Sequence, residues 1–208
     1  MPDIHQDDVR EDLLRLTLRL VNSIKRADRM IQELLDASAL QIGEKVALKF
    51  RDCDMISVIQ EVMAELPHKE HARVLLDGVS AKGCWDSEAL RRAIENLVTN
   101  ALKYGDSTSA ITIKVRPAHE RVMVTVHNYG AHIPVEEQEA LFQAFRRSHS
   151  AKSSGKPGWG IGLALVRAVA EGHGGSVVVD SRPEKGTAFI IDIPEDARPF
   201  LNAPVTGS

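Results

Sequence analysis

The sequence of 208 residues lacks several features that would place it in a specialised class. Its two cysteines, Cys53 and Cys84, are too few for a disulfide framework and fit no metal-binding spacing. We therefore interpret both as ordinary thiols in a reducing compartment. No apolar run approaches the ~20 residues that span a bilayer, and the acidic, polar N-terminus does not resemble a signal peptide. We expect a soluble, cytoplasmic chain, although a longer gene product could still be anchored in a membrane by an upstream part.

An excess of charge of one sign is also absent. The chain has 26 basic and 29 acidic residues, a net charge of −3, which argues against a broad nucleic-acid-binding surface. Apolar residues make up 43% of the chain, enough to form a core. The length fits one ordinary domain with an appendage, or two small domains.

The first forty residues show a helical repeat. From about residue 7 to residue 40, apolar side chains recur at steps of three and four, in a heptad-like pattern with a second apolar line beside it. The main line is Leu13, Leu16, Leu20, Ile24, Ala27, Ile31 and Leu34, and the second is Leu14, Val21, Met30 and Leu35. So broad an apolar face must contact more than one neighbour. The helix either packs on its own domain or joins an intermolecular bundle, and its terminal position favours the bundle.

The remaining sequence predicts mixed helices and strands. We expect a linker containing Phe50 and Asp52, helices at 55–66, 86–104, about 136–145 and 160–172, and strands at 73–76, 110–115 and 121–127. A closing hairpin is expected over 176–193. This order predicts an α+β fold, a two-layer α/β sandwich in which helices cover one face of a mixed sheet. The tail from 197 to 208 is expected to be disordered.

One helix is expected to present a row of polar side chains. Asn96 and Asn100 are four residues apart and share a face, and Lys103 lies one position from the next repeat of that face. Ile94, Leu97 and Ala101 are expected to face the core instead. Mg²⁺ prefers oxygen ligands and keeps several waters, so an amide oxygen beside a lysine suits a metal with phosphates. Alone, the pattern fits a solvated helix face equally well.

Two further stretches contain glycine at informative places. A strand is expected to end at Asn128, followed by a turn at Gly130, where a short polar side chain can meet the edge of a purine. Gly158, Gly160 and Gly162 alternate and run into a helix, where close backbone approach and free N–H groups suit phosphate. An ordinary strand exit and a flexible loop are the alternatives. The second stretch also lacks the context of the dinucleotide and mononucleotide loops.

The order of these stretches resembles the nucleotide-binding motifs of the histidine kinases. Residues 96–104 resemble the N box, 128–134 the first glycine box, 141–145 the F box, 158–163 the second glycine box, and 186–187 the last. The resemblance covers about residues 50–194. It implies the Bergerat-type ATP-binding fold shared with type II topoisomerases, mismatch-repair ATPases and a heat-shock chaperone.

The resemblance implies roles for the matching positions. Asn100 would hold Mg²⁺, Asn96 would support it, and Lys103 would reach the phosphates of ATP. Asn128 would accept from the adenine amino group, and Arg147 would contact phosphate from the edge of a lid. The full set of implied nucleotide contacts is Tyr104, Asn128, Gly130, Ile133, Phe145, Arg147, Gly158, Gly160, Ile161, Gly162, Leu163 and Thr187.

Two positions depart from the family pattern. Asn128 stands where aspartate is usual, so the acceptor oxygen is kept, the charge is lost, and an amide donor is added. ATP binding is expected to survive this change in weakened form. His132 replaces the second glycine of the same box and is expected to be a rim or surface residue.

The N-terminal helix resembles the second helix of the dimerisation and phosphotransfer hairpin. We therefore divide the chain into a partial hairpin at 1–45, an ATP-binding domain at 46–196 and a tail at 197–208, with a homodimer formed through the first part. The helix that would carry the phosphoaccepting histidine is not seen, and His5 lacks its sequence context. We expect a fragment that binds ATP without phosphorylating itself.

The implied function is that of the ATP-binding catalytic domain of a sensor histidine kinase. The γ-phosphoryl would pass to a histidine and then to an aspartate of a response regulator, by positioning and charge neutralisation. An ATP-hydrolysing relative would need a carboxylate where Asn96 stands, and Glu95 faces about 100° away on the helix. The same absence argues against the anti-sigma serine kinases. A degenerate member that serves as an ATP-binding scaffold or phosphotransfer adaptor stays open.

Overall fold

The computed structural model describes residues 10–17, 19–21, 23–24, 48–146 and 160–200. The strands are β1 (Arg51–Asp54), β2 (Val74–Gly78), β3 (Lys82–Trp85), β4 (Ile111–Ala118), β5 (Arg121–Asn128), β6 (Ser176–Arg182) and β7 (Gly186–Pro194). The helices are α2 (Met55–Ala64), α3 (His68–His71), α4 (Ser87–Tyr104), α5 (Val135–Gln138) and α7 (Gly162–Gly172), with 3-10 turns η1 (Glu139–Phe142) and η2 (Arg198–Phe200).

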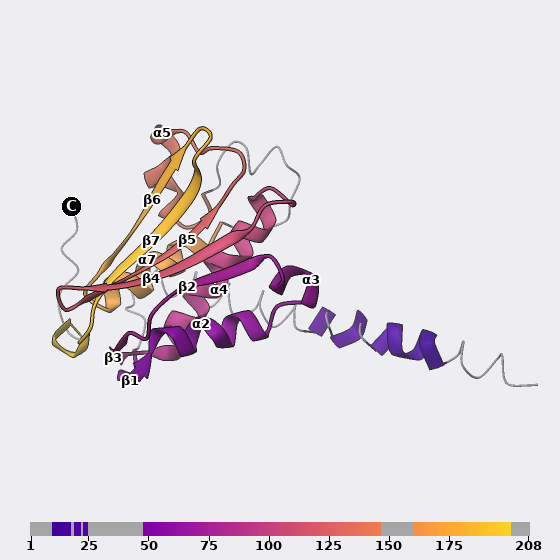
Figure 1. The fold of residues 1–208 in the computed structure, drawn as a ribbon, viewed down its shortest axis with the longest axis horizontal. Helices are drawn as coiled ribbons and strands as arrows, with labels where there is room; N and C mark the ends of the chain where they lie inside the picture. The colour runs from indigo at the N-terminus through magenta and orange to yellow at the C-terminus, as the bar shows by residue number, and fades with distance from the viewer. Residues whose placement is uncertain (1–9, 18, 22, 25–47, 147–159, 201–208) are drawn as a thin grey trace, which may run out of the picture.

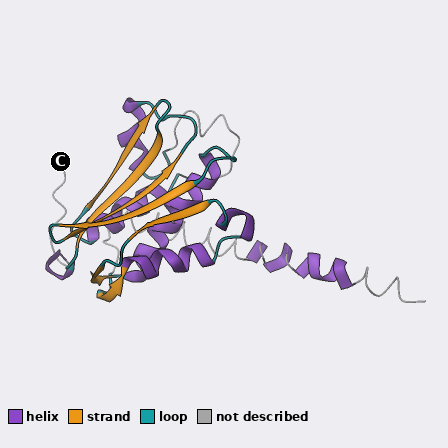
Figure 2. Cartoon of the chain, viewed as in Figure 1, coloured by secondary structure: helices purple, strands orange, loops and turns teal. Residues whose placement is uncertain are grey.

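The main sheet has five strands in the order β2-β4-β5-β7-β6. The β2–β4 pair is parallel and the other pairs are antiparallel, so the sheet is mixed. Along β5 the burial alternates: Val122, Val124 and Val126 are buried, while Met123 is exposed. The helices α2, α4 and α7 cover the buried face, as Figures 1 and 2 show. This arrangement agrees with the α+β, two-layer prediction.

Helix α4 crosses the centre of the covered face. Asp86 caps its N-terminus by accepting a hydrogen bond from the amide of Ala89 at 2.9 Å. Its apolar residues Ile94, Leu97 and Ala101 are buried, as the sequence predicts. The polar side chains of α4 are therefore left on the opposite side of the helix.

Several parts of the fold differ from the prediction. The single helix expected at about 136–145 is observed as the short helix α5 followed by the 3-10 turn η1, and Phe145 has a positive φ that ends any helix before it. The segment expected to be a linker contains β1, which pairs with β3 in a separate two-stranded antiparallel sheet, with Asp52 opposite Cys84. The disordered tail is predicted to begin at residue 197, but Ala197 is fully buried and residues 198–200 form η2. The ring of Phe200 lies against Gly174, which holds this end of the chain on the domain. Residues 201–208 lie outside the described residues.

The described N-terminal residues, at 10–17, 19–21 and 23–24, are helical. Leu16 and Leu20 are 57% and 60% exposed, so the apolar face expected from the sequence is uncovered in the single chain. The rest of the predicted first helix and His5 lie outside the described residues. The division of the chain at residue 45 stays a prediction.

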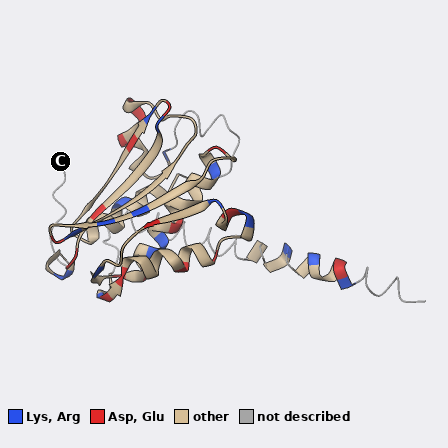
Figure 3. Ribbon diagram, viewed as in Figure 1, with Lys and Arg blue, Asp and Glu red and all other residues tan. Residues whose placement is uncertain are grey.

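Charged residues of both signs are interspersed along the described helices and strands (Figure 3). This distribution agrees with the nearly balanced charge of the sequence. No helix in the described part of the chain combines the length and the apolar character that crossing a bilayer requires.

Candidate functional site

The start of α7 approaches the polar face of α4 closely. A Cβ atom at Gly162, the first residue of α7, would lie 2.5 Å from Oδ1 of Asn96. Any side chain at this position would collide with the amide, so glycine permits the contact. The amide of Asn96 is itself held, because Nδ2 donates to the carbonyl of Arg92 at 2.9 Å. The predicted N box and second glycine box therefore meet in the structure.

The F box ends beside the beginning of the second glycine box. The backbone N–H of Phe145 donates to the carbonyl of Gly160 at 2.9 Å. Gly160 has a φ of 74°, and a Cβ there would lie 2.4 Å from the carbonyl oxygen of Arg146. The predicted lid spans about residues 146–159, so the two residues that flank it are joined by a main-chain hydrogen bond. Arg147 and Gly158, which were predicted to contact nucleotide, lie in the interval 147–159, outside the described residues.

The N-terminus of α7 has the properties of an anion site. Its N-cap residue, Ile161, is buried and makes no side-chain capping bond to the helix. The first N–H groups of such a helix carry a partial positive charge and suit a phosphate group. Leu163 is partly buried against the core, so this residue and Ile161 fix the position of the helix start.

The end of α4 lies against the first glycine box. The backbone N–H of Asp106 donates to the carbonyl of Tyr129 at 2.7 Å. Gly105 and Gly130 form an isolated antiparallel bridge, which places Gly130 beside the last turn of α4. In that turn the Lys103 ammonium lies 5.2 Å from the ring centroid of Tyr104.

A buried polar group connects the first and last glycine boxes. Asn128 on β5 pairs with Thr187 on β7, and the two residues are 7% and 4% exposed. Nδ2 of Asn128 donates to the carbonyl of Tyr129 at 3.1 Å, which directs the amide oxygen away from that carbonyl. The Thr187 hydroxyl is 2.7 Å from the hydroxyl of Ser181, which accepts from the backbone N–H of Ile133 at 2.8 Å.

Ser181 was missed by the sequence analysis, although its hydroxyl links the first glycine box to the last. It is buried on β6, one position inside the end of the strand. The alternating pattern of that strand was an available signal, since Val177, Val179 and Ser181 share one face. Hydroxyl groups on short strands have many other uses, so the pattern alone gives no role.

The polar row on α4 consists of amides and an amine. Asn96, Asn100 and Lys103 are all half-buried, between the core side of α4 and solvent. Among the described residues there is no group of three or more histidine, cysteine or acidic side chains that could hold a metal. A metal bound here would rely on amide oxygen, water and ligand oxygens, which is the donor set that Mg²⁺ accepts.

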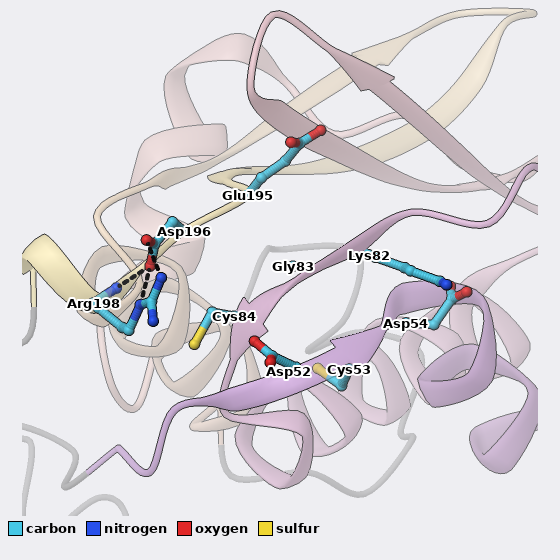
Figure 4. Close-up of a pocket in the computed structure, with 9 residues that line it drawn as sticks. All are labelled: Asp52, Cys53, Asp54, Lys82, Gly83, Cys84, Glu195, Asp196 and Arg198. Atoms are coloured by element: carbon cyan, nitrogen blue, oxygen red, sulfur yellow. Dashed lines mark hydrogen bonds and ion pairs between the residues drawn. The ribbon is translucent and has the colours of Figure 1, made fainter.

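A pocket of about 610 Å³ lies elsewhere, between β1, β3 and the segment from Glu195 to Arg198 (Figure 4). Its lining is Asp52, Cys53, Asp54, Lys82, Gly83, Cys84, Glu195, Asp196 and Arg198, and it includes none of the predicted site residues. Several of these side chains have structural partners: Asp54 caps α2, and Arg198 pairs with Asp196 at 2.7 Å. Burial raises the pKa of both thiols, which keeps them protonated. We therefore assign the site to the α4–α7 region instead.

Comparison with known proteins identifies the family to which the chain belongs. Residues 85–197 match the family described as histidine kinase-, DNA gyrase B- and HSP90-like ATPase. The sensor-like histidine kinase SenX3 of Mycobacterium tuberculosis is 31% identical over 193 residues, which is 90% of this chain and 46% of SenX3. Sensor protein IrlS of Burkholderia pseudomallei is 29% identical over 182 residues, or 85% of this chain and 38% of IrlS. The chain thus spans less than half the length of these curated relatives.

Solved structures share the same fold. The mycobacterial sensor histidine kinase MprB gives a TM-score of 0.63 at 28% identity, covering 70% of this chain and 99% of that one. The catalytic domain of histidine kinase ThkA gives 0.62 at 26% identity, covering 72% and 98%. The resemblance to a histidine kinase ATP-binding domain and the fold class inferred from the sequence are therefore confirmed.

Proposed function

We propose that this chain, which belongs to the family of histidine kinase-, DNA gyrase B- and HSP90-like ATPases, donates the γ-phosphoryl group of ATP to a histidine as part of a sensor histidine kinase. The matched family and relatives support an ATP-binding catalytic domain of the histidine kinase type. The phosphoryl group then passes to an aspartate of a response regulator. ThkA, whose catalytic domain resembles this chain, was solved in complex with the response regulator TrrA, which is the class of partner proposed here.

The close contact between Gly162 and Asn96 is the observation that carries the proposal. It brings the start of α7, which we propose as the phosphate site, to the amide row of α4, as a nucleotide bound between them requires. We assign the metal-binding amide oxygen to Asn100, with Asn96 in support and Lys103 near the phosphates. Mg²⁺ held there offsets the charge of the phosphate oxygens. The N–H groups at Gly160 and Gly162 complete the phosphate contacts.

The base of the nucleotide is assigned to the group around Asn128. The orientation of its amide leaves the oxygen as the acceptor for an adenine amino group. Thr187, Ile133 and Gly130 surround this position through the contacts described above. Tyr104, Phe145, Ile161 and Leu163 are the remaining described positions that we assign to the pocket, and Arg147 and Gly158 belong to the same proposal.

In the proposed transfer, a neutral imidazole nitrogen attacks the γ-phosphorus. The new nitrogen–phosphorus bond forms as the bond to the ADP oxygen breaks, and the imidazole proton passes to solvent. The chain holds the phosphates in place and stabilises their charge, and it takes no proton itself. A scaffold that binds ATP without phosphoryl transfer shares the same pocket, so only an activity measurement separates the two functions.

The site assignment is tested by titrating a fluorescent ATP analogue with and without Mg²⁺. Asn100→Ala should weaken Mg²⁺-dependent binding by about tenfold or more, because a ligand oxygen is removed from a charged complex. Without Mg²⁺ the variant and the wild type should bind alike. Glu95→Ala is the matched control. Glu95 is on the same helix, but its carboxylate pairs with the guanidinium group of Arg91 at 3.8 Å and is not assigned to the site. Equal Mg²⁺-dependent affinity of Asn100→Ala and the wild type contradicts the assignment.

A further inference from the structure

Residues 48–50 lie against the ends of two helices. The side chain of Leu48 packs on Gly172 at the end of α7. The backbone N–H of Lys49 donates to Oδ2 of Asp86 at 2.7 Å, at the start of α4. The ring of Phe50 lies 5.2 Å from that of His173, measured between centroids. These three residues come directly after the interval 25–47, which leads from the N-terminal helix.

His173 joins the two helix ends to each other. It is fully buried. Its Nδ1 lies 2.7 Å from the carbonyl oxygen of Val169, so Nδ1 carries the ring proton and donates it to that oxygen. Nε2 then accepts from the backbone N–H of Asp86 at 3.1 Å. This assignment uses both ring nitrogens of a neutral imidazole. These contacts hold together the start of α4, the end of α7 and residues 48–50. We call this group the Asp86–His173 junction.

The same two helices carry the candidate nucleotide site at their other ends. On α4, Asn96 follows Asp86 by ten residues, about 15 Å of helix. On α7, Gly162 precedes His173 by a comparable length, and it touches Asn96. A shift of either helix at the nucleotide site therefore moves the junction, because an α-helix in a packed core moves as a rigid element.

We propose that docking of residues 48–50 on the Asp86–His173 junction is energetically coupled to nucleotide binding. The inference rests on the function proposed above. Nucleotide that orders the helix pair stabilises the docked segment, and the docked segment strengthens nucleotide binding by the same factor. The occupancy of the nucleotide site is in this way communicated to the segment that leads from the N-terminal helix. Asp86 and His173 are positioning residues in this scheme, because neither contacts the proposed nucleotide.

Asp86→Asn separates the junction from the helix cap. Asparagine caps a helix as well as aspartate does, so the bond from the amide of Ala89 is kept. Its NH₂ group replaces the oxygen that accepts from Lys49, so that bond is lost. Asp54→Asn is the matched control, because Asp54 caps α2 in the same way and accepts from Ser80 with its second oxygen. Helix α2 carries no proposed nucleotide contact.

Two measurements on the whole chain test the coupling. Hydrogen exchange at the amide of Lys49 should slow by at least about fivefold when Mg²⁺ and a non-hydrolysable ATP analogue are added. Asp86→Asn should abolish this response and weaken affinity for the analogue by the same factor, whereas Asp54→Asn should change neither. Phe50→Leu, which removes the ring contact and leaves both caps intact, gives the same test if Asp86→Asn fails to fold.

The outcomes distinguish this inference from the function on which it rests. Wild-type chain that binds the analogue with no change in exchange at Lys49 overturns the coupling alone. The coupling is also overturned if Asp86→Asn and Phe50→Leu both bind the analogue with the affinity of the wild type. A wild-type chain that binds no analogue overturns the proposed function and the coupling with it.

Discussion

Below about pH 6.5 we expect the free energy of unfolding to fall because of His173. Burial lowers the pKa of this imidazole, although its hydrogen bond to Val169 and the negative charge of Asp86 oppose the effect. A proton added at Nε2 would face the backbone N–H of Asp86, which now donates to that nitrogen. The folded protein therefore holds His173 in its neutral form.

The sign follows from comparing the two states. In the unfolded chain His173 titrates near 6.5, above its lowered pKa in the fold. As the pH falls, the unfolded state binds the proton first, so the stabilising contribution is complete above about pH 6.5 and is lost below it. The loss is at most about 1.4 kcal/mol per pH unit and ends at the lowered pKa.

Urea unfolding of the wild type and His173→Gln, between about pH 7.5 and about pH 5, measures the effect. The variant is less stable at neutral pH because the junction is broken, but it lacks this proton linkage. The difference in unfolding free energy between the two proteins should therefore shrink by up to about 1.4 kcal/mol from pH 6.5 to pH 5.5. The other histidines titrate in both proteins and cancel. A difference that stays constant across this range refutes the reasoning.

Two further predictions concern the site and the N-terminal helix. Gly162→Ala should weaken binding of the Mg²⁺–ATP analogue about tenfold, because the added methyl group displaces Asn96. The free energy of unfolding should change by less than about 1 kcal/mol, because the higher helix propensity of alanine offsets the loss of the hydrogen bond between Asn96 and Arg92. Unchanged affinity in this variant contradicts the assigned contact. Leu16→Glu combined with Leu20→Glu should convert a dimer to a monomer in analytical ultracentrifugation, with nucleotide affinity unchanged. A wild-type chain that sediments as a monomer excludes this dimer.

The longer elements of the fold could be predicted because each repeats its pattern several times. Helix α4 has a cap, an apolar face and eighteen residues, and the β6–β7 hairpin has two alternating strands around a glycine turn. Strands β1 and β3 have four residues each and pair with one another in a sheet of two strands. Four residues scarcely establish a period, and a partner thirty residues away leaves no local trace.

The same reasoning explains which parts of the site were found. The order of the motifs located the amides and the glycines, because each motif is a short local stretch and its combination of residue types is uncommon. The contacts that hold the motifs in place join distant residues, such as Ser181 to Ile133 and His173 to Asp86, 48 and 87 positions apart. A buried histidine in a helix end looks ordinary in sequence, and its two hydrogen bonds appear only in the fold.

The chemistry of the α4 face bears on which acceptor the phosphoryl group meets. Attack by water needs a group that removes a proton beside the γ-phosphate. The position that such a base would occupy holds Asn96, whose amide already donates to Arg92 and cannot accept a proton in this role. The neighbouring Glu95 is directed to Arg91 instead. A neutral imidazole is itself a nucleophile at physiological pH and requires no such base. The described face of α4 is therefore suited to a histidine acceptor and poorly suited to water. Steady ATP hydrolysis by this chain at about 1 s⁻¹ or faster, a rate typical of enzymes, would contradict that argument.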